Sequence, residues 1–81
     1  MILPTKRLSP DRALLAVGAE ILTLLDEPKT VSRLWEEIRL TRARRAHTAA
    51  VTYDWFVLAL DLLYLLRAVD LERGRIRRAH T

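Results

Sequence analysis

The stretch VDLERGRIRR, residues 69–78, changes the pattern of the chain from helical to extended. Its apolar residues alternate with charged ones, and the Arg73-Gly74 pair at its centre fits a tight two-residue turn between antiparallel strands. This register pairs Leu71 with Ile76, Asp70 with Arg77 and Glu72 with Arg75. Two of these cross-strand pairs join opposite charges, which favours the register. The turn and the charges therefore predict one β-hairpin over residues 69–78.

Three helical segments precede this hairpin. The first begins with Ser9 as N-cap and Pro10 at the first helical position, and apolar residues then recur every three or four positions. Thr30 and Thr52 are placed to cap two further helices. We expect helices over residues 9–27, 30–45 and 52–67.

The order of these elements predicts the fold class. Three helices followed by a hairpin is the order of elements in a winged helix. Residues 1–8 add an extended segment, in which Pro4 restricts any strand to the edge of a sheet. We therefore predict one mainly α, winged-helix-like domain over residues 1–81, with the hairpin as its wing.

The composition bears on the cellular compartment of the protein and on the charge of its binding partners. The chain has no cysteine, which excludes a disulfide framework and a thiolate metal site and is compatible with a reducing cytoplasm. Met1–Pro4 is too short for a signal-peptide core, and the apolar run Trp55–Leu66 is well below the ~20 residues that a membrane helix needs. The net charge of +4 favours contact with an anionic partner. We expect a cytoplasmic protein without a membrane span.

The sequence offers little for catalysis. His47 and His80 are its two histidines, and neither has a carboxylate nearby at catalytic or metal-binding spacing. No glycine-rich loop is present to hold a phosphate. We therefore expect a protein that is not an enzyme and has neither a metal nor a cofactor.

Two groups of arginines are candidates for contact with nucleic-acid phosphates. The first arginine cluster is Arg39, Arg42, Arg44 and Arg45, and the hairpin cluster is Arg73, Arg75, Arg77 and Arg78. Such contacts would give salt-dependent binding without sequence preference. The alternative is a solvated basic face, partly neutralised on the hairpin by Asp70 and Glu72.

The third predicted helix has the wrong chemistry to read DNA bases. At about 100° per residue, nearly every direction around it is apolar except the one shared by Asp54 and Asp61. These acids mark the solvent side, and together with their apolar neighbours they form what we call the outer face: Asp54, Val57, Leu58, Asp61 and Leu65. Residues that read bases are typically Arg, Lys, Asn or Gln.

We expect the apolar outer face to be buried, because a helix that is apolar all round is normally buried all round. It is buried either by the N-terminal segment, through Ile2 and Leu3, or by another chain. We favour a partner protein, with Ile2 and Leu3 contributing to the same surface. A homodimer that covers this face with a second copy is a further alternative.

Four stretches in order resemble a known family: Ile2–Lys6, Leu14–Leu22, Glu27–Glu36 and Tyr53–Tyr64. They are similar to the small middle components of bacterial ABC three-component systems, specifically the sixth middle-component family. Two features depart from the pattern of that family. Arg67-Ala68 stands where such sequences commonly turn through a glycine, and residues 41–51 form a longer, arginine- and alanine-rich insertion.

This resemblance implies a non-enzymatic, winged-helix-like adaptor encoded beside an SMC-like or Rad50-like ABC ATPase and an effector subunit. It also implies a role in bacterial defence against phage or plasmids. A DNA-binding regulator, with contacts through the wing and the first arginine cluster, is the alternative that the residues leave open.

Overall fold

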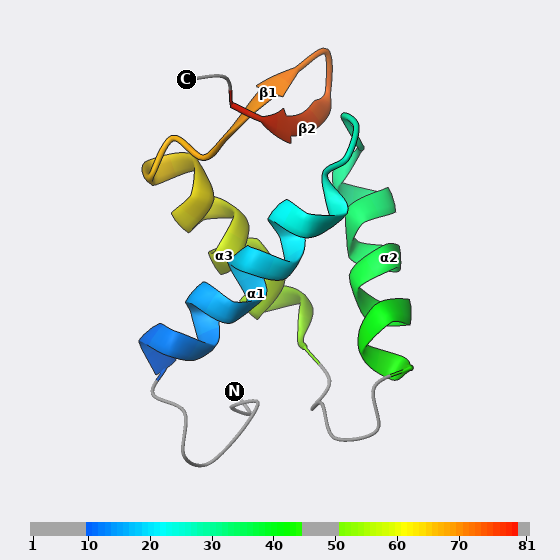
Figure 1. The fold of residues 1–81 in the computed structure, drawn as a ribbon, viewed down its shortest axis with the longest axis vertical. Helices are drawn as coiled ribbons and strands as arrows, with labels where there is room; N and C mark the ends of the chain where they lie inside the picture. The colour runs from blue at the N-terminus through cyan, green and yellow to red at the C-terminus, as the bar shows by residue number, and fades with distance from the viewer. Residues whose placement is uncertain (1–9, 45–50, 80–81) are drawn as a thin grey trace.

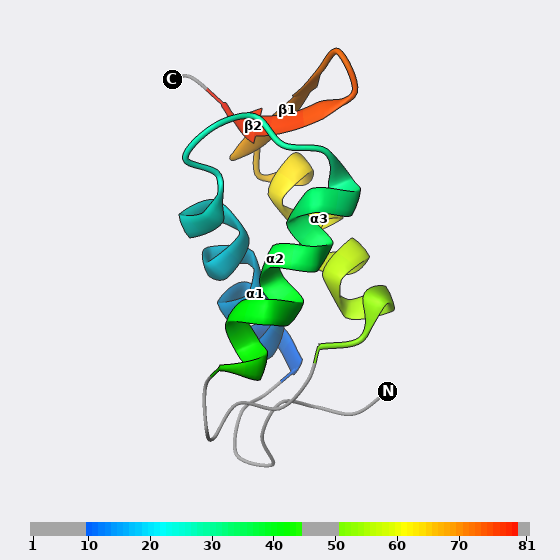
Figure 2. The same cartoon turned by 90° about the vertical axis from the view of Figure 1, so that its right-hand side faces the viewer.

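The computed structural model describes residues 10–44 and 51–79. Its elements are α1 (Pro10–Leu24), α2 (Val31–Ala43), α3 (Tyr53–Leu65), β1 (Val69–Glu72) and β2 (Arg75–Arg78). The three helices pack together, and the hairpin of β1 and β2 lies across one end of them (Figures 1 and 2). The predicted fold class, mainly α with a C-terminal antiparallel hairpin, is confirmed. The extended segment expected at residues 1–8 lies outside the described residues.

Threonine caps begin the second and third helices as predicted. The Thr30 hydroxyl accepts a hydrogen bond from the backbone N–H of Arg33 at 3.2 Å, and the Thr52 hydroxyl accepts one from Trp55 at 3.3 Å. Each bond satisfies a donor that the first turn of a helix leaves unpaired. The α-helices are shorter than the predicted ranges, which included these caps and parts of the connecting segments.

The core lies where α1 and α3 pack together and α2 covers them. Its most deeply buried large side chains come from all three helices and from β2: Val17, Ile21, Leu34, Ile38, Phe56 and Ile76. Gly18 is buried where α1 faces α3, and a Cβ added there would lie 3.4 Å from Leu63 Cδ2, which is ordinary van der Waals contact. On the α2 side, Trp35 packs against Phe56 with ring centroids 5.3 Å apart.

The hairpin has the predicted register, with Leu71 opposite Ile76. Arg73 and Gly74 both have positive φ, 54° and 79°, which is the conformation of a type I′ turn. One charge pair differs from the prediction. Glu72 lies opposite Arg75 in register but forms its ion pair diagonally, with Arg77 at 2.8 Å.

A two-bond cap ends α3 and turns the chain into β1. The N–H of Arg67 donates to the Tyr64 carbonyl at 3.0 Å, and that of Ala68 donates to the Leu63 carbonyl at 2.9 Å. This is the Schellman arrangement, which requires a left-handed residue at the position of Arg67. Arg67 has a φ of 59°, so an arginine occupies a conformation that favours glycine.

Lys29 joins the segment between α1 and α2 to the hairpin. Its backbone N–H and carbonyl pair with Ile76 at 2.9 and 2.7 Å. Its side chain is buried, and the ammonium group donates to the Leu24 carbonyl and to Glu37, both at 2.6 Å. One residue thus ties the end of α1, the α2 helix and β2 together.

Candidate protein-interaction surface

The outer face of α3 is exposed along the helix. Asp54 and Asp61 both face solvent, as the angular positions predicted. Between and beyond them, Leu58 is 45 % exposed and Leu65 is 80 % exposed, while Val57 is half-buried. The opposite side of α3 supplies Phe56, Ala59, Leu60 and Leu63 to the core. Ile2 and Leu3, which were expected to join this surface, lie outside the described residues.

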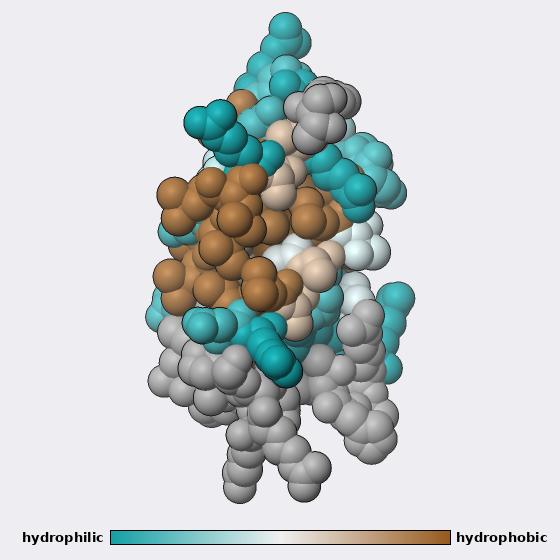
Figure 3. Space-filling view, turned by 60° about the vertical axis from the view of Figure 1, so that its left-hand side comes forward, coloured by the Kyte–Doolittle hydropathy of each residue, from teal (hydrophilic) through white to brown (hydrophobic). Residues whose placement is uncertain are grey.

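Sequence reasoning missed several apolar side chains that the structure leaves exposed, among them Leu66 and Leu15. Leu66, the C-cap of α3, is 60 % exposed, and Leu15 on α1 is 54 % exposed. Leu15 lies off the apolar stripe of α1, and this could have indicated its exposure. Figure 3 shows that apolar side chains gather in a broad patch on one side of the helices, while the hairpin above is mostly hydrophilic.

The acids of the outer face are not paired within the described part of the chain. Asp54 and Asp61 have no ion pair there, whereas seven of the other eight acids pair with lysine or arginine. Burial, followed by the negative charges of Asp70 and Asp61, raises the pKa of the Tyr64 phenol. The outer face is therefore both apolar and acidic.

The structure does not bring the described residues of the first arginine cluster together on one basic face. Arg42 is buried and forms an ion pair with Glu20 of α1. Arg39 donates two hydrogen bonds to Glu36, at 2.8 and 2.9 Å. Arg44 is exposed, and Arg45 lies outside the described residues. Acids that are distant in sequence or one helical turn away thus neutralise Arg39 and Arg42.

The hairpin cluster divides into two pairs. Arg77 binds Asp70 at 2.6 Å and Glu72 at 2.8 Å, and the hydrogen bond to Asp70 raises the pKa of Arg77. Arg78 donates to the carbonyl of Leu22 on α1, at 2.5 and 2.9 Å. Arg73 and Arg75, at the tip, are exposed and have no ion pair among the described residues. The tip, rather than the whole hairpin, is the basic surface.

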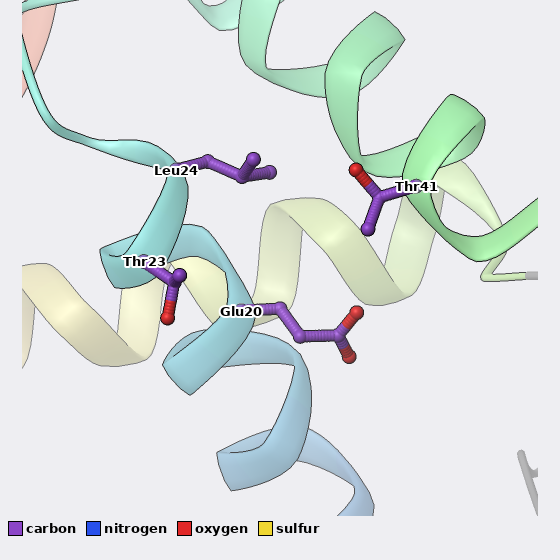
Figure 4. A pocket seen from close by; sticks show the side chains of 4 residues that line it. All are labelled: Glu20, Thr23, Leu24 and Thr41. Carbon is purple, nitrogen blue, oxygen red and sulfur yellow. The ribbon is translucent and has the colours of Figure 1, made fainter. Parts of the chain in front are cut away.

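A small pocket between α1 and α2 is lined by Glu20, Thr23, Leu24 and Thr41, with a volume of about 70 Å³ (Figure 4). Glu20 is held there by Arg42, and the Thr23 hydroxyl donates to the Ala19 carbonyl at 3.0 Å. These polar groups already have structural partners. His47 and His80 lie outside the described residues, and within residues 10–44 and 51–79 no three potential metal ligands cluster.

No helix within the described ranges has both the length and the apolar character that crossing a bilayer requires.

Fold and surface together define a small three-helix domain with a C-terminal hairpin and an exposed apolar surface on its third helix. Residues 3–79 match the model of the family described as ABC-three component (ABC-3C) system Middle Component 6. The chain belongs to this family, as the four similar stretches indicated. No curated protein and no solved structure matched the chain. A component of a three-component system works with partner proteins.

Proposed function

We propose that the protein is a non-catalytic adaptor that docks through the outer face of α3 on another subunit of its system. Family membership supports the existence of partners. The single observation that carries the proposal is the exposure of Leu58 and Leu65 on a helix whose other side forms the core. The partners we propose are the ABC ATPase and the effector subunit, in a cytoplasmic system of defence against phage or plasmids.

The hydrophobic effect favours binding of a partner protein to the outer face of α3. Full burial of one leucine side chain stabilises an association by about 1.5–3 kcal/mol before the costs of binding. Leu58, Leu65 and the adjoining Leu66 are each at least 45 % exposed, so covering them removes a substantial apolar area from water. Large apolar patches rimmed by charge are typical of interaction sites.

A second surface would allow the protein to bridge two subunits. The hairpin tip carries Leu71, which is 57 % exposed, together with Arg73 and Arg75. It projects beyond the helices and away from the apolar patch (Figure 3). We assign the outer face to one partner and the hairpin tip to the other.

Co-expression tests this proposal. The tagged protein is produced with the ATPase and effector encoded beside it, and the complex is recovered through the tag. Leu58→Glu should lose one subunit from the complex, because a buried, unpaired carboxylate would face the partner. Leu40→Glu is the matched control, since Leu40 is 49 % exposed but lies on α2. Recovery of both subunits with Leu58→Glu would refute docking through this face.

Contact with DNA is a second candidate function, and the exposed arginines of the hairpin tip favour it. Two phosphate contacts predict that the logarithm of the binding constant falls with a slope near −1.8 against the logarithm of salt concentration, by counterion release of about 0.9 per contact. Alanine at both Arg73 and Arg75 should remove this salt-dependent binding to a duplex. Arg39→Ala should not, because Arg39 is already paired with Glu36. Absence of duplex binding at low salt would exclude this function.

A further inference from the structure

Asp61 lies in the middle of an apolar surface and has no counter-ion among residues 10–44 and 51–79. Its neighbours one helical turn away in either direction are Val57, Leu58, Tyr64 and Leu65, and none of them is a cation. The structure describes all ten acids of the chain, and seven of them form ion pairs: Glu20, Asp26, Glu27, Glu36, Glu37, Asp70 and Glu72.

The position of Asp61 distinguishes it from Asp11 and Asp54, the other two acids without an ion pair among the described residues. Asp11 and Asp54 lie in the first turns of α1 and α3, where the helix dipole stabilises a negative charge. Asp61 lies beyond the middle of α3 and has no such stabilisation. Its charge is therefore not balanced within the part of the chain that the structure describes.

Covering Leu58 and Leu65 would remove Asp61 from water. A carboxylate that loses its hydration without gaining a partner carries a large free-energy penalty. A wholly apolar partner surface would therefore bind this face poorly. A partner that brings a positive charge to Asp61 would offset the lost hydration with a charge-assisted hydrogen bond.

We propose that the outer face docks a segment of the partner subunit that places apolar side chains on Leu58 and Leu65 and a lysine or arginine against Asp61. This inference rests on the proposed adaptor function and specifies the chemistry of the partner. It also disfavours a second copy as the cover. The outer face of α3 contains no cation, so a two-fold copy would bring acids from both chains into one apolar interface.

Affinity measurements on the purified complex with the ATPase subunit test whether the partner places a positive charge against Asp61. Asp61→Asn should weaken binding about tenfold, and Asp61→Lys more, because each leaves the partner's cation without its counter-charge. The dissociation constant of the native protein should rise between 50 and 300 mM salt more steeply than that of Asp61→Asn. Glu36→Gln, an exposed acid on α2, is the control and should bind as the native protein does.

The outcomes separate this inference from the proposed function. If Asp61→Asn binds with native affinity and native salt dependence while Leu58→Glu loses binding, the outer face docks a partner, but the proposed contact between Asp61 and a cation of that partner is refuted. If Leu58→Glu and Leu65→Glu both bind with native affinity, the proposed function fails and this inference fails with it.

Sedimentation of the isolated protein tests whether a second copy of the chain binds the outer face of α3. We expect a monomer over the accessible concentration range. A dimer that Leu58→Glu dissociates would place a second copy on the outer face and overturn the inference.

Discussion

The Nζ atom of Lys29 lies 2.6 Å from a carboxylate oxygen of Glu37, and this contact connects the hairpin to α2. The Lys29 ammonium also lies 3.1 Å from Asp26. Because the backbone of the same residue pairs with Ile76, the position of β2 depends on a charge cluster between the first two helices. The hairpin that supplies the proposed second binding surface is thus held by an ion pair as well as by apolar packing.

Removal of the Lys29 side chain should destabilise the fold. Lys29→Ala would leave Glu37 in a partly buried site with Arg33 as its remaining cation. We expect a loss of about 2–3 kcal/mol in the free energy of unfolding, measured by urea denaturation. Arg33→Ala should cost less, because Arg33 is exposed. Equal losses for the two variants would contradict the central position of Lys29.

The same cluster should make stability depend on pH at both extremes. Hydrogen bonding to Lys29 is the main cause that lowers the pKa of Asp26 and of Glu37, from ordinary values of 3.8 and 4.5. Their contribution is present above those values and is lost as pH falls through the lowered folded-state pKa values. Hydrogen bonding to Glu37 raises the pKa of Lys29 above 10.5, so its contribution is present below that value and is lost as pH rises further.

Urea denaturation at pH 3, 7 and 11 measures this dependence. Native protein should be most stable near neutral pH. Lys29→Met should show a smaller fall in the free energy of unfolding at each extreme, because Asp26 and Glu37 no longer interact with an ammonium group. If the variant followed the pH profile of the native protein, the charge cluster around Lys29 would not be the source of the pH dependence.

Glycine at position 67 should stabilise the protein. Arg67 has a φ of 59°, which costs an ordinary residue free energy that glycine does not lose. We expect Arg67→Gly to raise the free energy of unfolding by about 0.5–1 kcal/mol, and Arg67→Val to lower it. Gly74→Ala, at a φ of 79°, should also lower it. Destabilisation by Arg67→Gly would mean that the arginine side chain contributes more than its backbone conformation costs.

Two substitutions at Gly18 should have opposite effects. Alanine at this helical position should stabilise α1 by up to about 1 kcal/mol, since the added Cβ makes only ordinary contact with Leu63. Leucine is too large for the buried space between α1 and α3, and Gly18→Leu should lower the thermal midpoint clearly. Thermal unfolding followed by circular dichroism measures both, and a stable Gly18→Leu would show that the two helices can separate without cost.

Features set by neighbouring residues could be predicted from the sequence. Thr30 and Thr52 cap helices because their hydroxyls reach N–H groups three residues ahead. The hairpin register follows from a two-residue turn at Arg73-Gly74. The solvent side of α3 follows from Asp54 and Asp61, because the angular spacing of a helix is fixed. These relationships span few residues and depend little on the rest of the fold.

Features that depend on distant contacts could not be predicted. Arg42 is buried because Glu20 reaches it from a position 22 residues earlier, and Arg78 is bound by the Leu22 carbonyl, 56 residues away. Neither partner follows from local pattern, so the arginines of each cluster looked equivalent. The geometry of the packed elements separated the arginines that bind other groups of the fold from Arg73 and Arg75, which are exposed and have no ion pair among the described residues.

The central claim, that the outer face of α3 docks a partner subunit, is tested most directly by titrating Leu65→Glu against the purified ATPase subunit. Leu65 is 80 % exposed, so this substitution should leave the thermal midpoint of the free protein nearly unchanged. We predict that the dissociation constant rises at least about a hundredfold, as expected for a charge introduced into a buried interface. Leu40→Glu should bind with native affinity. Native affinity for Leu65→Glu would contradict the claim.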